Sequence, residues 1–267
     1  MHPMLNIAVR AARAAGNIIA RNLGQNDQFE VTEKRKDDLV TDVDRECGQT
    51  ITSILLKSYR DHAVLGEEGG VQGNKDSQFQ WIIDPVDGTT NFVQGVPHVG
   101  VSIALKHNGK TEVAVVFDPI KNEMFTASRG DGAQLNGRRI RVASRPSLEG
   151  SIIATAVPVR YRERMSAYIP LLSRLIDNCA DIRRMGVASL DLAYVACGRF
   201  DGYLEQGLKP WDFAAGELLI REAGGIVTDF MGETGYVKSG NILCGNPNIV
   251  KGLLKVTDPK TLPEVLR

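Results

Sequence analysis

The sequence is poor in cysteine and has no long hydrophobic run. Its 267 residues include only four cysteines, Cys47, Cys179, Cys197 and Cys244, which lie far apart and lack CxxC spacing. This spacing argues against a disulfide scaffold or a CxxC zinc site, and predicts reduced thiols in a cytoplasmic protein. No apolar run approaches the roughly 18 residues that a membrane-spanning helix needs. The first 24 residues lack the charged start and unbroken apolar stretch of a signal peptide.

Net charge and familiar nucleophile motifs are also missing. The 32 Lys and Arg residues balance the 32 Asp and Glu residues. We therefore expect neither autonomous nucleic-acid binding nor attachment to an anionic membrane. The motifs CxxxxxR and GxSxG, which mark covalent Cys and Ser nucleophiles, are absent. Histidines 62, 98 and 107 show no i, i+4 spacing of a zinc site. The sequence therefore gives no sign of a covalent Cys or Ser intermediate.

The hydrophobic pattern changes along the chain and predicts a mixed α/β fold. Apolar residues at three- to four-residue spacing predict a helix over residues 4–23. Residues 33–38 (EKRKDD) read as a polar loop or a flap over the site. Residues 99–140 alternate between apolar runs and turn signals, which predicts an antiparallel meander. We therefore divide the chain into an α+β half, residues 1–145, and an α/β half, residues 146–267.

Four short segments each end an apolar run with an acidic residue: LGEEGG, WIIDPVDGTT, YLEQG and KPWDFAAG. In the second, Pro85 has no N–H, so we expect the strand to stop there or to lie at a sheet edge. Asp84, Asp87 and the carbonyl of Val86 can then face one space. Such hard oxygen ligands suit Mg²⁺.

A glycine and a threonine follow the aspartates directly. Gly88 allows close backbone approach, and a helix that begins at this point would offer free N–H groups to a phosphate. Two simpler interpretations stay open. Asp84 and Asp87 lie in DP and DG dipeptides that are common in turns, and Asp212 suits a helix N-cap.

Taken together, these motifs resemble the inositol monophosphatase family. The match rests on GEE, WIIDPVDGTTNF and KPWDFAAGELLIREAGG in this order, with DLVTDVD and GVASLDLAYVACGRFDGYLEQG between and before them. It extends along nearly the whole chain, and the length and N-terminal residues are similar to bacterial members. The resemblance implies a layered αβαβα sandwich of the Mg²⁺-dependent, Li⁺-sensitive sugar phosphatases, many of which are homodimers.

The resemblance also implies roles for individual residues. Two or three Mg²⁺ ions, with Mn²⁺ as a possible substitute, would be held by Glu67, Asp84, the carbonyl of Val86, Asp87 and Asp212. The catalytic residues would be Glu67, Thr89 and Asp44. Asp44 and Thr89 would orient or deprotonate the attacking water, and Asp38 would support the loop. The substrate would contact Gly88, Thr89, Arg183, Gly186, Ala188, Glu205 and Asp212.

The expected activity is metal-dependent hydrolysis of inositol monophosphates and related small sugar or polyol phosphates by direct attack of a metal-activated water. Nucleotide or sugar bisphosphates are alternative substrates. A second alternative, implied by the bacterial members, is a protein-binding role in transcription antitermination or ribosome biogenesis. The sequence departs from the family at Gly69, where serine is usual, and at Val187, where a small hydroxyl residue is usual. These departures bear on the metal-bearing loop and the pocket wall.

Overall fold

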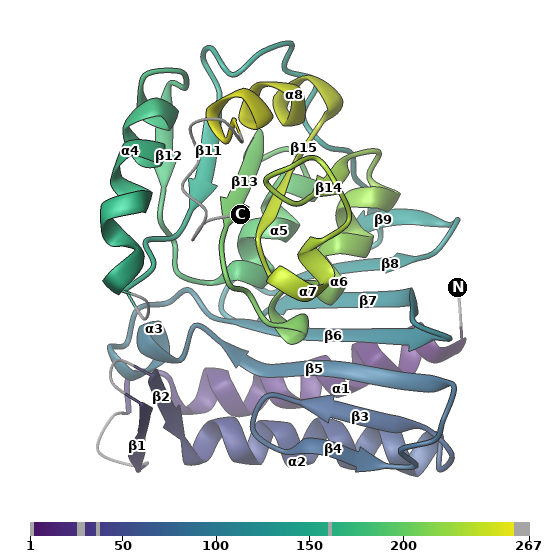
Figure 1. Ribbon diagram of the computed structural model, residues 1–267. Helices are drawn as coiled ribbons and strands as arrows, with labels where there is room; N and C mark the ends of the chain where they lie inside the picture. Colours follow the sequence, from purple (N-terminus) through teal and green to yellow (C-terminus); the bar gives the residue numbers. More distant parts are fainter. Residues whose placement is uncertain (1–2, 26–29, 36–37, 160–161, 259–267) are drawn as a thin grey trace.

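Five layers of alternating helices and sheets make up the protein, as the resemblance predicts (Figure 1). The computed structural model describes residues 3–25, 30–35, 38–159 and 162–258. The mixed α/β fold class is therefore confirmed. No helix in these described ranges is long and apolar enough to span a membrane.

Two long helices, α1 (Pro3–Asn22) and α2 (Asp42–Ser58), form the first layer. The α1 face that packs inward carries the apolar residues whose spacing predicted the helix, namely Leu5, Ala8, Ala12, Ala15 and Ile19. At the start of α2, the Thr41 hydroxyl accepts from the Asp44 N–H, and the Asp44 carboxylate accepts from the Thr41 N–H. This reciprocal cap satisfies two backbone donors that a helix end leaves free.

The second layer is an eight-stranded sheet in the order β10-β9-β8-β7-β6-β5-β3-β4. Its strands are β3 (Ala63–Gly66), β4 (Gly70–Gly73), β5 (Phe79–Asp87), β6 (Gly100–His107), β7 (Lys110–Asp118), β8 (Glu123–Ser128), β9 (Gly132–Leu135) and β10 (Arg138–Arg139). Strands β6 to β10 form the predicted antiparallel meander, and only β3 and β5 pair in parallel. Asn108, Asn122 and Asn136 adopt positive φ in its turns, which asparagine tolerates.

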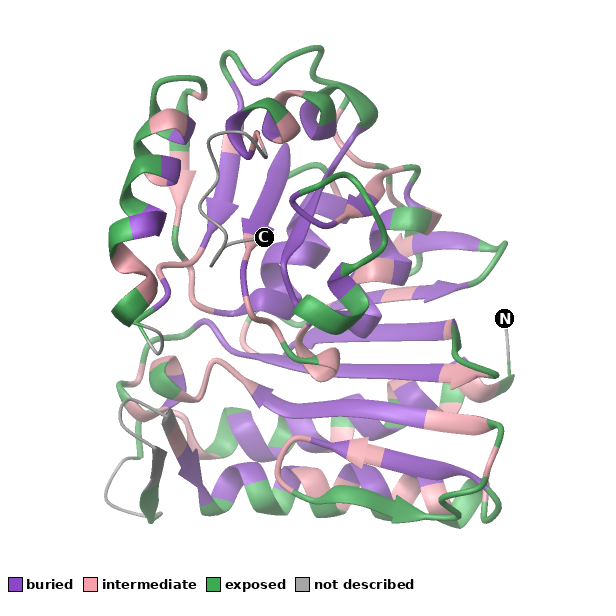
Figure 2. Ribbon diagram, in the orientation of Figure 1, coloured by how far each residue is buried: buried purple, intermediate pink, exposed green. Residues whose placement is uncertain are grey.

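Both faces of the central strands β5 to β8 are buried, because side chains alternate along each strand and helices cover each face. In β5, Trp81 and Ile83 pack toward α1 and α2, whereas Ile82 packs into the core on the other face. The paired residue Ala104 of β6 continues that second face. Figure 2 shows the sheet buried through most of its length.

The third layer, α5 (Ala188–Ala196) and α6 (Pro210–Glu222), lies between this sheet and a second one. Every residue of α5 is buried. The second sheet has the order β12-β11-β13-β15-β14. Its strands are β11 (Ile152–Thr155), β12 (Asp181–Arg183), β13 (Gly202–Glu205), β14 (Ile226–Thr228) and β15 (Ile242–Gly245).

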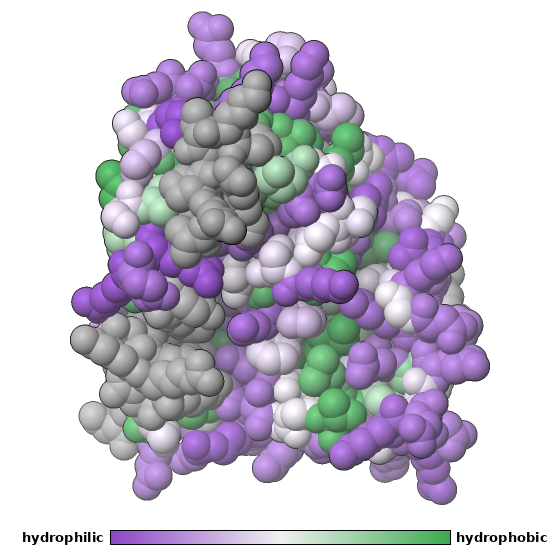
Figure 3. Space-filling view, viewed as in Figure 1, coloured by the Kyte–Doolittle hydropathy of each residue, from purple (hydrophilic) through white to green (hydrophobic). Residues whose placement is uncertain are grey.

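Helices α4 (Met165–Ile176) and α8 (Pro247–Val256) form the outer layer. The remaining short elements are α3 (Thr89–Val93), η2 (Arg162–Arg164) and α7 (Tyr236–Ser239). On the face in Figure 3, hydrophilic side chains cover most of the surface, with small hydrophobic groups between them. The junction proposed at residue 145 falls between β10 and β11, and the division into halves stays a prediction.

Two local expectations need correction. Residues 33–38 were expected to be a loop, but β1 (Val31–Arg35) and β2 (Asp38–Thr41) pair as antiparallel strands. The side chains of residues 33–38 lie outside the described residues, so the flap and the supporting role of Asp38 stay predictions. The strand before Pro85 was expected to stop there or to lie at an edge, whereas β5 is internal and runs on to Asp87. Pro85 fits because β3 pairing ends at Ile83 and the β6 register is irregular after Asp84.

Candidate active site

The candidate site begins at the irregular end of β5. Asp84 pairs in register with Ser102 of β6, and the next paired residue is Asp87, which is opposite Gly100. The Asp84 Oδ1 atom accepts a hydrogen bond from the Val86 N–H at 3.1 Å. This contact fixes the turn that carries both aspartates.

The next residues turn the chain into α3. Gly88 caps this short helix with φ of 94°, a left-handed conformation that glycine adopts without strain. Thr89 then brings two distant segments together: its Oγ1 atom lies 3.0 Å from Asp44 Oδ1 and 3.1 Å from the Val86 carbonyl oxygen. A hydroxyl has one proton to donate, so these two acceptors share it. Asp44 itself is held by the backbone N–H and hydroxyl of Thr41.

A side-chain contact between layers brings Asp212 to the same place. Ser102, the partner of Asp84 in the sheet, donates its hydroxyl to the Trp211 carbonyl at 3.0 Å. Asp212 follows in the first turn of α6, where its Oδ2 atom accepts from the Lys209 N–H at 2.6 Å. The N-cap of α6 is therefore Lys209 and not Asp212 as the N-cap interpretation had it; Asp212 is the third helical residue, and its carboxylate accepts from the N-cap N–H. A carboxylate can make this contact with one oxygen and bind a ligand with the other.

The carboxylates repel one another. Burial raises the pKa of Asp84 well above its ordinary value, and the negative charges of Glu67, Asp87 and Asp212 raise it further. The pKa of Asp212 is also raised, first by desolvation and then by Asp87. Burial likewise raises the pKa of Asp44, against the hydrogen bonds that it accepts. The structure thus gathers acidic residues from four segments into one electrostatic cluster.

The proposed substrate residues lie on four segments: the turn into α3, residues 183–188, the end of β13 and the start of α6. The N–H of Ser189, directly after Ala188, donates to Asp87 Oδ2 at 2.7 Å. Gly186 precedes α5 with φ of 78°. Glu205 ends β13, where the Tyr203 hydroxyl donates to it and its charge helps raise the pKa of Asp212. Their roles in substrate binding stay predictions.

Sequence reasoning missed two ionisable groups near this cluster. Arg183, the predicted contact, forms an ion pair with Asp181 at 2.5 Å. A guanidinium nitrogen of its neighbour Arg184 instead lies 2.9 Å from the position that a Cβ on Gly186 would occupy. Asp191 is buried in α5, and its Oδ1 atom has no hydrogen-bond partner among the described residues. Burial, then the charges of Glu205 and Asp87, raise its pKa well above normal. The only sequence signal for Asp191 was the presence of an aspartate in an otherwise apolar helical pattern.

The chemistry of these residues suits a divalent cation, although their spacing does not yet form a ligand shell. Among the residues that the structure describes, no group of three or more His, Cys, Asp or Glu side chains is arranged to hold a metal ion. Hard carboxylate oxygens are the ligands that Mg²⁺ prefers, and a cation would offset the repulsion that raises the pKa of Asp84 and Asp212.

The two departures from the family pattern have different surroundings, and only Val187 lies against a predicted site residue. A Cβ added to Gly69 would meet the amide end of the Gln72 side chain at 2.4 Å, so a serine there requires that side chain to move. Val187 is buried, and its Cγ2 atom lies 2.7 Å from where a Cβ on Gly88 would be. Val187 is therefore part of the surface that packs on the turn after β5.

Comparison with known proteins shows the family and the fold. The sequence model of the inositol monophosphatase family matches residues 1–262. The chain belongs to the inositol monophosphatase family, and this membership supports phosphatase chemistry.

Three relatives cover nearly the whole chain. Nus factor SuhB of Escherichia coli strain K12 is 54% identical over 254 residues, which are 95% of each chain. The crystal structure of extragenic suppressor protein SuhB from Bartonella henselae has 41% identity and a TM-score of 0.94, covering 97% of this chain and 99% of that one. Inositol monophosphatase from Anabaena has 35% identity and a TM-score of 0.86, covering 97% and 96%.

Proposed function

We propose that this chain is a Mg²⁺-dependent phosphomonoesterase that hydrolyses inositol monophosphates and related small sugar or polyol phosphates. The observation that carries the proposal is the electrostatic cluster of Glu67, Asp84, Asp87 and Asp212, in which the charges of Glu67 and Asp87 disfavour ionisation of Asp84 and Asp212. Shared cations would offset this repulsion. Similarity to the inositol monophosphatase from Anabaena supports the substrate class.

The residues beside the cluster support direct attack by water. When bound, Mg²⁺ would lower the pKa of a water and offset the charge of the phosphate ester. Asp44 would accept the water proton through the Thr89 hydroxyl, to which Asp44 Oδ1 is hydrogen-bonded at 3.0 Å. The raised pKa of Asp44 favours a role as proton acceptor at neutral pH.

The remaining residues would orient the ester. Gly88 lacks a Cβ, so its backbone can approach the phosphate closely. Glu205 is held by the Tyr203 hydroxyl and would accept hydrogen bonds from the polyol hydroxyls. Gly186 and Ala188 would line the pocket beside it.

The test is phosphate release from a panel of inositol, sugar and nucleotide phosphates, with and without Mg²⁺, Mn²⁺ and Li⁺. We expect Mg²⁺-dependent release that is inhibited by Li⁺ and is fastest with inositol monophosphates. Faster release from bisphosphates would favour the alternative substrates. A homodimer is also expected, and light scattering at assay concentration checks it.

Two matched variants distinguish a specific effect of the acidic cluster from the general effect of removing one negative charge. Asp84→Asn should lower phosphate release at least about a hundredfold and remove the Mg²⁺-dependent rise in melting temperature. Asp177→Asn, an exposed change at the end of α4, should alter neither. Substantial activity of Asp84→Asn at saturating Mg²⁺ would refute the shared role of Asp84.

The second candidate function is protein binding in transcription antitermination. One observation favours it: the Escherichia coli relative, 54% identical, is named a Nus factor. Asp87→Asn distinguishes the two functions, because loss of phosphate release with intact binding to transcription proteins would show that they use different surfaces.

A further inference from the structure

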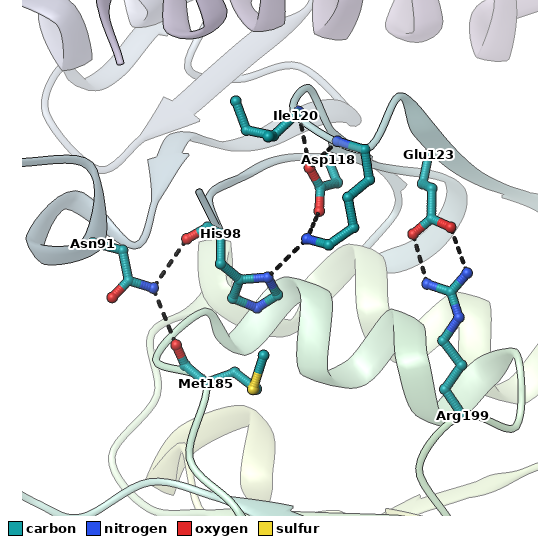
Figure 4. A network of polar contacts seen from close by, with 8 residues as sticks. Asn91, His98, Asp118, Ile120, Glu123, Met185 and Arg199 are labelled. Atoms are coloured by element: carbon teal, nitrogen blue, oxygen red, sulfur yellow. Dashed lines mark hydrogen bonds and ion pairs between the residues drawn. The ribbon is translucent and has the colours of Figure 1, made fainter. Parts of the chain in front are cut away.

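The side-chain amide of Asn91 connects the turn after β5 with the proposed pocket wall. Asn91 lies in α3, two residues after Thr89. Its Nδ2 atom donates to the His98 carbonyl and to the Met185 carbonyl, each at 3.0 Å. Figure 4 shows Asn91 extending between these two carbonyl oxygens. One amide nitrogen thus uses both of its protons to join two segments that are far apart in the sequence.

The His98 end of this connection is firmly held. The His98 ring Nδ1 lies 3.2 Å from Lys121 Nζ, which also lies 2.7 Å from Asp118 Oδ2. The Asp118 side chain is completely buried, and its other oxygen accepts from the N–H groups of Ile120 and Lys121 at 2.9 Å. Burial and the Lys121 ammonium lower the pKa of His98 to about 4, so the ring is neutral and can accept from Lys121. These contacts therefore hold His98 against the end of β7 in the eight-stranded sheet.

The Met185 end lies in an irregular segment. Met185 comes between β12 and α5 and is followed by Gly186 and, two residues later, by Ala188, the proposed pocket residues. No ladder hydrogen bonds hold Met185 or Gly186 in a sheet. Their position depends on contacts with other segments, of which the Asn91 amide is one.

Two further contacts lie on the same segment. The Ser189 N–H donates to Asp87 Oδ2 at 2.7 Å. Val187 packs so closely on Gly88 that a Cβ on Gly88 would lie 2.7 Å from its Cγ2 atom. Residues 185–189 are thus docked on residues 87–91 at three points. The Asn91 contact can be removed without touching a proposed ligand.

We propose that Asn91 is a positioning residue that holds residues 185–188 against the turn after β5 and thereby sets the affinity for the polyol part of the substrate. The proposal rests on the proposed phosphatase function. Asn91 contacts neither phosphate nor metal in this scheme. It acts through the backbone of the pocket wall, so it should influence KM for polyol esters more than kcat.

Asn91→Asp is a sharp test because the side chain keeps its shape but loses both N–H donors. Its carboxylate would face two carbonyl oxygens and repel them. Two hydrogen bonds of typical strength shift the docking equilibrium by roughly tenfold to a hundredfold. We expect KM for inositol monophosphate to rise about tenfold or more, with kcat within about threefold. KM for p-nitrophenyl phosphate, which has no polyol hydroxyls, should change less than about threefold.

Hydrogen exchange gives a readout that does not require activity. Amide exchange of residues 183–189 should accelerate in Asn91→Asp by a similar factor, while exchange in β6 and β7 stays unchanged. Asn248→Asp, an exposed change of equal charge in the first turn of α8, should leave both exchange and KM unchanged. Lys121→Met should raise exchange in the same segment to a smaller extent, because it loosens the anchor indirectly.

Several outcomes would overturn the proposal. Unchanged exchange over residues 183–189 in Asn91→Asp would show that the amide does not hold the segment. An equal rise in KM for both esters, or a fall in kcat alone, would show a general structural or catalytic defect. If the wild-type protein released no phosphate from any ester, the proposed function would fail, whereas the exchange experiment would still decide whether Asn91 docks the segment.

Discussion

Replacing Gly88 by alanine tests how tightly the turn after β5 is packed. Gly88 has φ of 94°, and its added Cβ would lie 2.7 Å from Val187 Cγ2. Gly88→Ala should therefore lower the free energy of unfolding for two separate reasons, the backbone strain and the clash. Gly224 has a similar φ of 88° but no heavy atom within 4 Å of its Cβ position, so Gly224→Ala isolates the backbone cost.

The magnitudes differ enough to be measured. The left-handed conformation costs a residue with a Cβ about 1–2 kcal/mol, which is the whole expected effect of Gly224→Ala. Overpacking at Gly88 adds about 1–3 kcal/mol, so Gly88→Ala should cost about 2–5 kcal/mol. Val187→Ala removes buried methyl groups and should cost about 2 kcal/mol alone. In the double variant it also removes the clash, so the combined cost should fall short of the sum by about 1–3 kcal/mol.

Urea unfolding of the four variants, followed by tryptophan fluorescence, measures these differences. Costs for Gly88→Ala and Val187→Ala that add within about 0.5 kcal/mol would refute the clash, because additive sites do not contact each other. A Gly88→Ala cost equal to that of Gly224→Ala would refute it as well.

Two further predictions concern charges outside the cluster. Asp118→Asn removes the buried carboxylate that pairs with Lys121, whose ammonium is half exposed and keeps its contact with His98, and should cost about 1–3 kcal/mol, whereas the exposed Asp177→Asn should stay within about 0.5 kcal/mol in the same urea assay. The hydrogen bond from Arg199 lowers the pKa of Glu123 from its ordinary 4.5, so this pair stabilises the protein above pH 4.5 and stops doing so as the pH falls through the lower folded-state pKa. The urea midpoints of wild type and Glu123→Gln should therefore converge on acidification, and a gap that stays constant down to the acid transition would contradict the pairing.

Local patterns predicted much of the fold. The spacing of Leu5, Ala8 and Ala12 predicted α1 because a helix needs one apolar stripe to pack on a sheet. The Asn108 and Asn136 turns predicted the meander, since asparagine before glycine favours the left-handed turn conformation. These features depend on residues within a few positions of each other.

Other features depended on neighbours that no local pattern reveals. Proline at position 85 suggested a strand end, but the structure continues β5 because β3 has already ended beside it. Polar residues suggested a loop at 33–38, whereas residues 33–35 belong to β1, which pairs with β2. The complete burial of α5 follows from its place between two sheets, which its composition alone does not specify.

The sequence by itself determined which residues we predict to carry the proposed chemistry: the acidic motifs around Asp84 and Asp212, and the glycine and threonine beside them. The tertiary structure alone decided that these segments meet, that Thr89 reaches Asp44, and that Asn91 reaches the Met185 carbonyl. The physical reason is range. Turn, cap and strand preferences act between near neighbours in the chain, whereas electrostatic repulsion among carboxylates arises only after the layers have packed and excluded water.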